Sequence, residues 1–407
     1  MVKPVDSEAM DVLMRFGASM VRSGNTAART REWIEVMARN MGFDAVSVSL
    51  SMDSITVTAN RSGESATTMR EIGALGVNVS RIANLEEVAR TAGPGQMPRD
   101  LAVKLENADA TKTLYSEMQI AAAVGLASGG FAFLNGAAAV EMCAAAIGGG
   151  IGQGVRSWLS RRHINHYGIA TVSAIAASGI FVLLAALARH GGFGFTNYPA
   201  GFIASVLFLI PGFPLVAGLF DLLRSQTVAA VSRMAYGVMI LLAVALGLST
   251  VIAVVGIDIT RQPALELAYP LKLLLRAMAS FIAACAFAML FNSPMRIVLA
   301  VGLLAVAANG LRLVFIDMGM MLAPAAFIAA LTIGLVALMA DQRFNVPRMA
   351  MAVAPVVIMM PGVYAFEMIV LFNRGQLLGA LEASAACGFV VGALAMGLAT
   401  ARFFSWR

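Results

Sequence analysis

The spacing of apolar residues divides the chain into two parts of different character. In the first part, apolar residues recur at helical spacing over residues 12–20 and 33–41. They then alternate with small or polar residues over 46–57, and a similar stretch follows near 67–69. This pattern predicts two helices, a β-hairpin and a third strand.

Two further helices are expected before the long apolar runs begin. Asn84 precedes an apolar stretch and is expected to be the N-cap of one helix. The other helix is expected to begin near Pro98, because proline is favoured in the first turn of a helix. Residues 1–115 are therefore predicted to form a small α+β domain.

From about Met118 onward, long apolar runs dominate the sequence. A helix that crosses a membrane needs roughly 20 mostly apolar residues. By that measure about ten spans are predicted, near residues 118–136, 138–158, 167–188, 198–222, 226–255, 267–291, 295–313, 319–340, 348–372 and 377–402. The expected fold is an all-α polytopic membrane protein that follows the small α+β domain.

Two of these runs are interrupted in the same way. Pro211-Gly212 lies in the middle of one run, and Pro361-Gly362 lies in another run 150 residues later. Proline removes a backbone hydrogen bond from a helix, so both runs are expected to be broken helices. A second match, 156 positions apart, pairs residues 154–156 with residues 310–312.

The two offsets predict that the membrane region is an internal repeat. Each repeat, over residues 116–256 and 257–407, holds five predicted spans. Because five is odd, the second repeat must enter the membrane upside down relative to the first. Such a 5+5 inverted-topology repeat is typical of alternating-access transporters, although some channels share it.

Composition agrees with a membrane protein and argues against other classes. The chain is 59% hydrophobic and 13% charged, against roughly 25% charged residues in soluble domains. The net charge of +6 comes from cations spread over loops and the N-terminal third, so no nucleic-acid partner is expected. The positive-inside rule predicts a multi-pass protein of the cytoplasmic (inner) membrane with both termini in the cytosol.

No pattern of catalytic or metal-binding residues is present. The three cysteines lie in apolar stretches and the three histidines flank predicted spans, which favours no disulfide framework, metal site or cofactor. Residues 1–115 contain neither histidine nor cysteine, so they hold no Ser-His-Asp or Cys-His site. The glycine run over 148–154 lacks the ending of a phosphate loop and predicts close helix packing instead. The chain is therefore not expected to be an enzyme.

The two breaks are candidates for substrate binding. At Pro211, Gly212, Pro361 and Gly362, carbonyl and amide groups are freed near the middle of the membrane. The ends of the half-helices also carry partial charges that can face a substrate. The alternative is a simple proline kink, which is common in membrane helices.

Polar side chains within the apolar runs are the other candidates, because ionisable residues are costly in a membrane. Glu367 is expected to be the proton-coupling residue, with interfacial snorkelling as the alternative. Asp221 and Arg276 are expected to contact the substrate. Asn309 is expected to line the same cavity, unless it only bonds across helices.

Three stretches resemble a known family. They read VRSGNTAARTREWIEVMARNMGFDAVSVSLSMDSITVT, ALGVNVSRIANLEEV and LIPGFPLVAGLFDLLRSQ. They are similar to the threonine/serine exporter family, and the last is also similar to the larger subunit of the two-component dicarboxylate (succinate) exporters. The second half has diverged, since Tyr364 stands where the first half has Pro214.

The resemblance implies an exporter of small hydrophilic carboxylates that is driven by the proton motive force. Threonine and serine are the substrates it implies first, and succinate is the alternative. An amino acid would need Glu367 or Asp221 for its ammonium group, whereas a dicarboxylate would favour Arg276. A membrane-anchored regulatory module is a third interpretation, and a homo-oligomer is left open.

Overall fold

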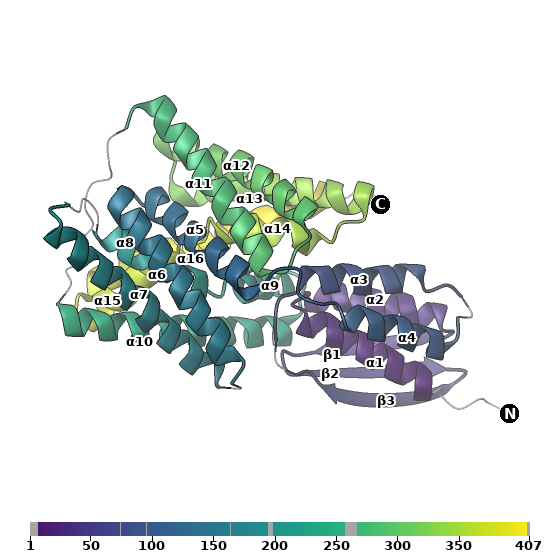
Figure 1. The fold of residues 1–407 in the computed structure, drawn as a ribbon. Helices are drawn as coiled ribbons and strands as arrows, with labels where there is room; N and C mark the ends of the chain where they lie inside the picture. The colour runs from purple at the N-terminus through teal and green to yellow at the C-terminus, as the bar shows by residue number, and fades with distance from the viewer. Residues whose placement is uncertain are drawn as a thin grey trace.

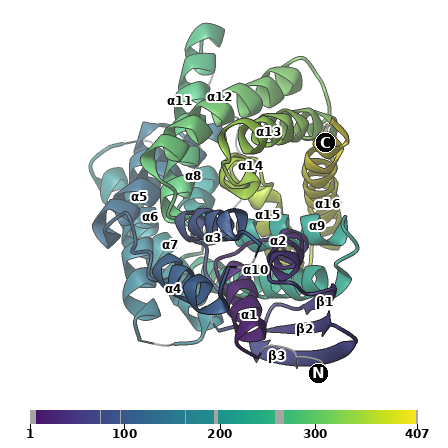
Figure 2. The same cartoon turned by 90° about the vertical axis from the view of Figure 1, so that its right-hand side faces the viewer.

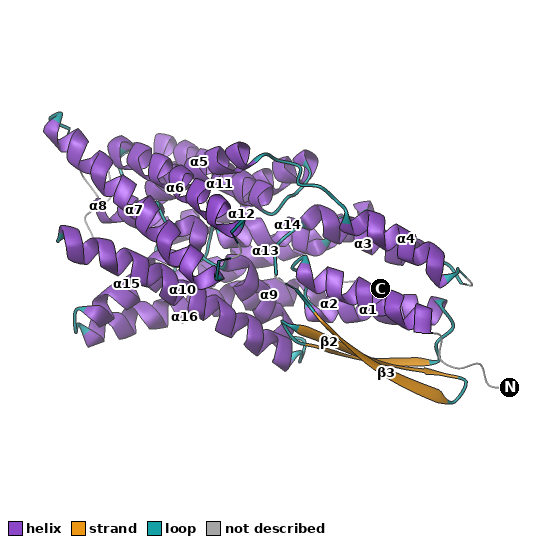
Figure 3. Cartoon of the chain, turned by 60° about the horizontal axis from the view of Figure 1, so that its bottom comes forward, coloured by secondary structure: helices purple, strands orange, loops and turns teal. Residues whose placement is uncertain are grey.

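The structure, a computed structural model, describes residues 7–73, 75–94, 96–162, 164–193, 198–256 and 267–404 (Figure 1). Two stretches of the expected second repeat, 257–266 and 405–407, lie outside these described residues. Helices dominate the described chain, and all of its strands belong to the part that precedes the long apolar helices (Figure 3).

The N-terminal part, residues 7–115, contains four helices and one sheet. Its elements are α1 (Ser7–Arg22), α2 (Ala27–Asn40), β1 (Ala45–Leu50), β2 (Ser54–Arg61), β3 (Glu64–Glu71), α3 (Val79–Thr91) and α4 (Pro98–Asp109). The sheet is antiparallel in the order β1-β2-β3, which confirms the predicted hairpin and third strand. Alternate residues of β2, Ile55 and Val57, are fully buried against the helices together with Leu13 and Phe16 of α1.

The expected N-cap of α3, Asn84, was wrong by six positions. The helix begins at Val79, and its N-cap is Asn78, whose side-chain oxygen accepts a hydrogen bond from the Arg81 backbone N–H at 2.9 Å. The apolar face already includes Val79 and Ile82, so the helical pattern starts before Asn84. Asn84 lies inside the helix and donates its side-chain amide to Thr111.

The remaining helices occupy all of the stretches in which spans were predicted. They are α5 (Glu117–Leu134), α6 (Ala139–Ser160), α7 (His166–His190), α8 (Tyr198–Ala204), the short 3-10 helix η1 (Leu207–Leu209), α9 (Gly212–Leu222), α10 (Thr227–Val255), α11 (Tyr269–Leu290), α12 (Met295–Asp317), α13 (Leu322–Phe344), α14 (Arg348–Val357), α15 (Gly362–Asn373), α16 (Leu377–Thr400) and the 3-10 helix η2 (Ala401–Phe404).

Seven of the described helices are long and apolar enough to cross a membrane, and nine spans result if each of two bent helix pairs counts as one. The tenth expected span corresponds to α6, which has the length of a span but is not among these nine. It carries Glu141, Gln153, Arg156 and five glycines, which lower its hydropathy. A Cβ atom on Gly148 or Gly152 would come within 2.6 Å of Ala177, which confirms that the glycine run serves close packing.

The two broken helices have nearly identical backbones. Pro211 has φ −76° and ψ 53°, and Pro361 has φ −79° and ψ 55°. In each case the following glycine donates its N–H to the carbonyl two residues earlier, at 2.7 Å for Gly212 and 2.8 Å for Gly362. These are inverse γ-turns. They bend the helix pairs α8–α9 and α14–α15 by 64° and 49°.

Corresponding glycines also pack in corresponding places. A Cβ atom on Gly247 of α10 would collide with the carbonyl of Thr171 in α7. A Cβ atom on Gly397 of α16 would collide with the carbonyl of Phe327 in α13. The glycines are 150 positions apart and their partners are 156 positions apart, which are the two offsets of the sequence match.

The N-terminal part is docked on one end of the long helices (Figure 1), and Figure 2 looks onto that end. The Val79 N–H donates to the carbonyl of Phe291, at the end of α11, at 2.9 Å. The Tyr115 hydroxyl donates to the Ser293 carbonyl at 2.7 Å, and burial raises the pKa of Tyr115. The Asn292 side-chain oxygen accepts from the Leu114 N–H at 2.7 Å.

A charged cluster adds to this docking. Arg29 of α2 bonds Glu86 of α3 at 3.2 Å and lies 3.7 Å from Asp341 of α13. Arg348 at the start of α14 bonds the same Asp341 at 2.7 Å. Burial alone would lower the pKa of Arg29, but Glu86, Asp341 and Glu32 outweigh it and raise that pKa. The guanidinium is therefore permanently charged where the two parts meet.

Candidate functional site

The two broken helices meet at their breaks, and this meeting point is here called the crossing. A Cβ atom on Gly212 would contact Val357 at 2.7 Å and Met360 at 3.3 Å. A Cβ atom on Gly362 would in turn contact Leu207 at 2.8 Å and collide with Ile210. Leu207 and Ile210 correspond to Val357 and Met360 at the offset of 150. The contacts are therefore reciprocal, as in a two-fold interface.

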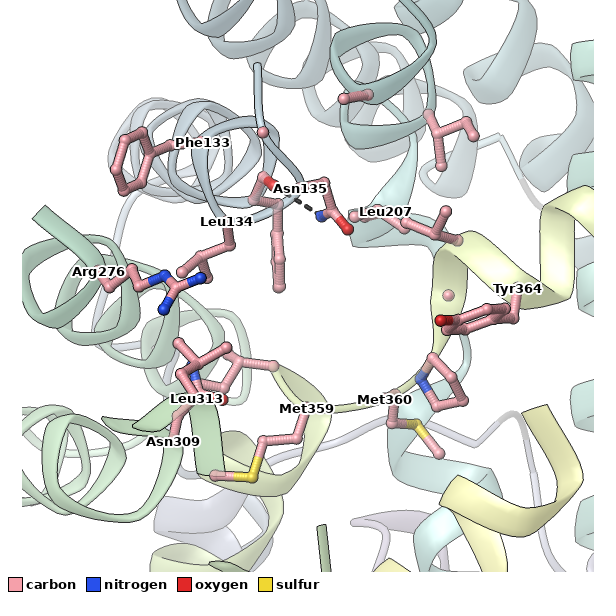
Figure 4. A pocket seen from close by; sticks show the side chains of 18 of the residues that line it. Phe133, Leu134, Asn135, Leu207, Arg276, Asn309, Leu313, Met359, Met360 and Tyr364 are labelled. Carbon is pink, nitrogen blue, oxygen red and sulfur yellow. Dashed lines mark hydrogen bonds between the residues drawn. The ribbon is translucent and has the colours of Figure 1, made fainter. Parts of the chain in front are cut away.

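A cavity of about 440 Å³, here called cavity A, lies against the second break. Pro361, Gly362, Tyr364 and Glu367 line it from the broken helix α14–α15. Arg276 of α11 and Asn309 of α12 lie across the open space from Tyr364 (Figure 4). A volume of this order suits a small molecule.

The cationic side of cavity A is formed by the first turns of α11. Lys272 and Arg276 both line the cavity and both pair with Asp317, at the end of α12. The distances from Asp317 are 3.4 Å to the Lys272 Nζ and 2.5 Å to an Arg276 Nη. Asp317 therefore partly neutralises this pair of cations.

A second arginine of cavity A lies next to the break itself. Arg312 of α12 donates from Nε to the Asn309 side-chain oxygen at 3.0 Å and from Nη1 to the Met359 carbonyl at 3.3 Å. Asn309 is 1% exposed and is oriented by a hydrogen bond from its Nδ2 to the Ser280 hydroxyl at 2.8 Å. The second break thus supplies a carbonyl that orients a guanidinium toward cavity A.

A second cavity of about 330 Å³, here called cavity B, lies against the first break. Pro211 and Gly212 line it from the broken helix, and Arg156 of α6 and Tyr236 of α10 line it from the side. Residues of the N-terminal part, among them Gly24, complete its wall. Arg156 corresponds to Arg312 of cavity A in the sequence match.

The two cavities lie at opposite ends of the same helices. Cavity A is lined by Arg276 near the start of α11, whereas cavity B is lined by Leu290 at its end. Likewise, Ala137 just before α6 lines cavity A, and Ser160 at the end of α6 lines cavity B. The cavities therefore approach the crossing of the broken helices from opposite faces.

Only a thin wall separates the two cavities. Phe287 of α11 and Ile210 of the first break line both of them. Phe287 packs edge-to-face against Phe131 of α5, with ring centroids 5.8 Å apart. Phe131 and Phe287 correspond at the offset of 156, so the wall contains a contact between matched positions.

Truncation of this wall is expected to cause a leak. Phe287→Ala removes a ring that is only 4% exposed and lines both cavities, and the side chains around such a gap close it incompletely. We expect proteoliposomes with this variant to dissipate a pH gradient several-fold faster than wild type, measured with an enclosed pH-sensitive dye. Phe389→Ala, which removes an exposed ring of α16, is the control. Equal leak rates for Phe287→Ala and wild type would contradict the wall.

The structure distributes the residues expected from the sequence over three places. Pro361, Gly362, Arg276, Asn309 and Glu367 come together around cavity A. The equivalent break, at positions 211 and 212, lies on cavity B. Asp221, the last candidate, lies on neither cavity.

Asp221 is found where α9 meets the N-terminal part. It is fully buried, and its Oδ1 accepts from the Ala28 N–H, in the first turn of α2, at 3.3 Å. Its other oxygen lies 3.4 Å from the Nε of Arg233, which is 4% exposed. Arg233 donates in turn to the Asn25 carbonyl at 2.6 Å. This network joins α9 and α10 to the N-terminal part.

Arg156, Arg312 and Tyr364 are the site residues that the sequence reasoning missed. The two arginines did appear in the match of residues 154–156 with 310–312, but only as evidence for its register. Their recurrence in two apolar helices was a usable signal, because an arginine inside a membrane is costly and marks function by default. The tyrosine gave no comparable signal, since tyrosine is enriched at the ends of membrane helices whether or not it has a role in a site.

The chemistry available at both cavities is recognition of an anion. Within the described part of the chain, no group of three or more His, Cys, Asp or Glu residues is placed to hold a metal ion. The lining of cavity A instead offers guanidinium, ammonium, amide and hydroxyl groups beside one carboxyl group, that of Glu367. Broken apolar helices with a cavity at each break are typical of membrane transporters.

Comparison with known protein families agrees with this class of protein and identifies the family. The model described as "Putative threonine/serine exporter" matches residues 11–255, and a second, "Threonine/Serine exporter, ThrE", matches residues 276–404. The chain belongs to the threonine/serine exporter family. It is a transport protein of an exporter family and not an enzyme.

Named relatives fall into two groups. The threonine/serine exporter of Corynebacterium glutamicum is 24% identical over an aligned length of 416, and the alignment covers 94% of this chain and 81% of that protein. The probable succinate transporter subunit YjjP of Escherichia coli K12 is 24% identical over 242 residues, which cover 59% of this chain and 92% of that protein. The YjjP of Klebsiella aerogenes is 22% identical over 233 residues, 56% of this chain and 86% of that protein. No solved structure matches the chain.

Proposed function

We propose that the protein exports small carboxylates by alternating access at the two broken helices, driven by the proton motive force. The observation that carries this proposal is the pair of cavities at opposite ends of α6 and α11, separated by the crossing of the breaks. A transporter of this kind opens one cavity while it closes the other around a fixed site. The reciprocal contacts at Gly212 and Gly362 support a two-fold relation between the halves.

The same relation supports the inverted repeat. Residues 116–256 and 257–407 would form two five-helix repeats of opposite orientation, which counts α6 as a span. Residues 1–115 would form a cytosolic domain, and cavity B would then open toward the cytosol. Arg161 and Arg162, which follow α6 at this end, agree with the positive-inside rule for the inner membrane.

L-threonine and L-serine are the first substrates to test, because the family and the relative that covers 94% of this chain carry these names. Glu367 would bind the ammonium group or the coupled proton. A dicarboxylate such as succinate is the second candidate. Cavity A favours it through three cations, Lys272, Arg276 and Arg312, beside the single carboxyl group of Glu367.

Counterflow in proteoliposomes tests the proposal directly. Vesicles would be loaded with threonine, serine or succinate, and exchange of the labelled compound would be followed with and without a pH gradient. Gradient-driven exchange of threonine or serine supports the amino-acid exporter, and exchange of succinate alone supports the dicarboxylate exporter. If none of the three exchanges with properly inserted protein, the proposal is wrong for these substrates.

Glu367→Gln is expected to separate coupling from binding. The variant keeps the size of the side chain but cannot carry a proton at this position, and its counterpart in the first half is the unionisable Ala217. We expect gradient-driven export to fall at least tenfold, whereas exchange without a gradient persists. Glu382→Gln, at an exposed position of α16, is the matched control. Normal gradient-driven export in Glu367→Gln would remove this residue from the coupling step.

A further inference from the structure

Each cavity contains one arginine whose charge is not neutralised by an ion pair. Arg276 pairs with Asp317, and the buried Arg233 pairs with Asp221. Arg156 in cavity B and Arg312 in cavity A form no ion pair with any residue that the structure describes. A cation without a counter-charge inside a membrane protein is costly, which points to an anion that arrives from outside.

The two arginines occupy matched positions beside matched breaks. Arg312 donates to the carbonyl of Met359, two residues before Pro361. Arg156 lines cavity B together with Leu209 and Pro211, which correspond to Met359 and Pro361. The acidic residues do not recur in this way, because Glu367 and Asp221 correspond to alanine and leucine in the other half. The feature that the two cavities share is therefore an anion-binding group.

Arg312 also has N–H donors that its described hydrogen bonds do not use. A guanidinium carries five N–H donors in one plane. The described contacts of Arg312 use Nε and Nη1, and they hold the plane at the edge of cavity A. The remaining donors suit the two oxygens of a carboxylate, with which a guanidinium forms paired, charge-assisted hydrogen bonds.

We infer that Arg312 and Arg156 bind the carboxylate of the transported substrate in turn, Arg312 at cavity A and Arg156 at cavity B. This inference rests on the proposed export function and assigns its carboxylate recognition to two residues. The substrate anion would pass from one guanidinium to the other when the crossing rearranges. Arg276 would attract the substrate, but its bond to Asp317 leaves it less suited to final recognition.

The test uses the sidedness of the two cavities. Transport would be measured in proteoliposomes of one orientation, with L-threonine and with succinate added in turn to each side. Arg312→Gln is expected to raise the half-saturating concentration at least tenfold on the side of cavity A and less than twofold on the other. Arg156→Gln is expected to do the reverse. A merely structural role would change both sides equally.

Conservative variants and a control complete the experiment. Arg312→Lys and Arg156→Lys keep the charge and are expected to recover part of the loss, whereas the exposed Arg296→Gln is expected to match wild type. The inference would be overturned if wild-type protein exchanges the compounds but both glutamine variants show a half-saturating concentration that is unchanged, or shifted equally on both sides. The export function would then still stand. Wild-type protein that exchanges neither compound would instead overturn the export function for these substrates, and the inference with it.

Discussion

Gly362→Val is expected to slow transport strongly, while the protein still inserts into the membrane. A side chain at this position would collide with Ile210 and press on Leu207 at the crossing of the two broken helices. Overpacking of this kind costs roughly 1–3 kcal/mol. If that cost falls on the movement of the crossing, it slows exchange by about 5- to 160-fold. Substrate counterflow measures the rate, and size-exclusion chromatography in detergent reports insertion and folding.

The matched control is Gly392→Val in α16, because a Cβ atom at this position would have no neighbouring atom within 4 Å. A second variant tests whether the collision with Ile210 is the cause. Ile210→Ala, added to Gly362→Val, restores room at the crossing and is expected to recover much of the rate. If Gly362→Val transports like wild type, the breaks do not meet as described. If Ile210→Ala fails to rescue, the effect of valine has another origin.

Asp221→Ala is expected to have the largest effect on stability. It would leave Arg233, which is 4% exposed, without its ion-pair partner. It would also remove the acceptor for the Ala28 N–H. Loss of one member of a buried pair costs roughly 3–5 kcal/mol. We expect a clear fall in the midpoint of thermal unfolding in detergent, with increased protease sensitivity of the N-terminal part.

Glu32→Gln is the control for this prediction, since Glu32 also forms ion pairs but has a side chain that is 45% exposed. Exposed pairs contribute about 0–1 kcal/mol, so the control should unfold close to wild type. An Asp221→Ala protein as stable as the control would show that Asp221 is not needed for docking. Its role as a substrate ligand would then be the alternative to test by transport.

The broken helices were the most predictable part of this structure. Proline cannot donate to the helical ladder, so Pro211 and Pro361 fixed the positions of the breaks from the sequence alone. The positions of the long helices were equally predictable from apolar runs of sufficient length. The start of α3 was not, because Asn78 and Asn84 are equally good caps and the packing of Val79 decides between them.

The assignment of polar residues to a site was only partly predictable. Arg276, Asn309 and Glu367 were selected because each is polar in an apolar run, and the structure gathers them at one cavity. Asp221 met the same criterion but contacts Ala28, which is 193 positions away in the sequence. The sequence shows that such a residue needs a partner, but only the tertiary arrangement shows whether that partner is a substrate or another part of the chain.

The reciprocal contacts at the crossing also bear on whether the two halves must be joined in one polypeptide. The two halves hold each other through α5 against α11, where Phe131 meets Phe287, and through the matched glycines at positions 212 and 362. None of these contacts depends on the peptide link between the halves. A chain ending at Gly256 and a second chain beginning at Leu267 would each carry one complete side of the interface. Co-expressed as two polypeptides, they have the surfaces needed to reassemble in a bilayer.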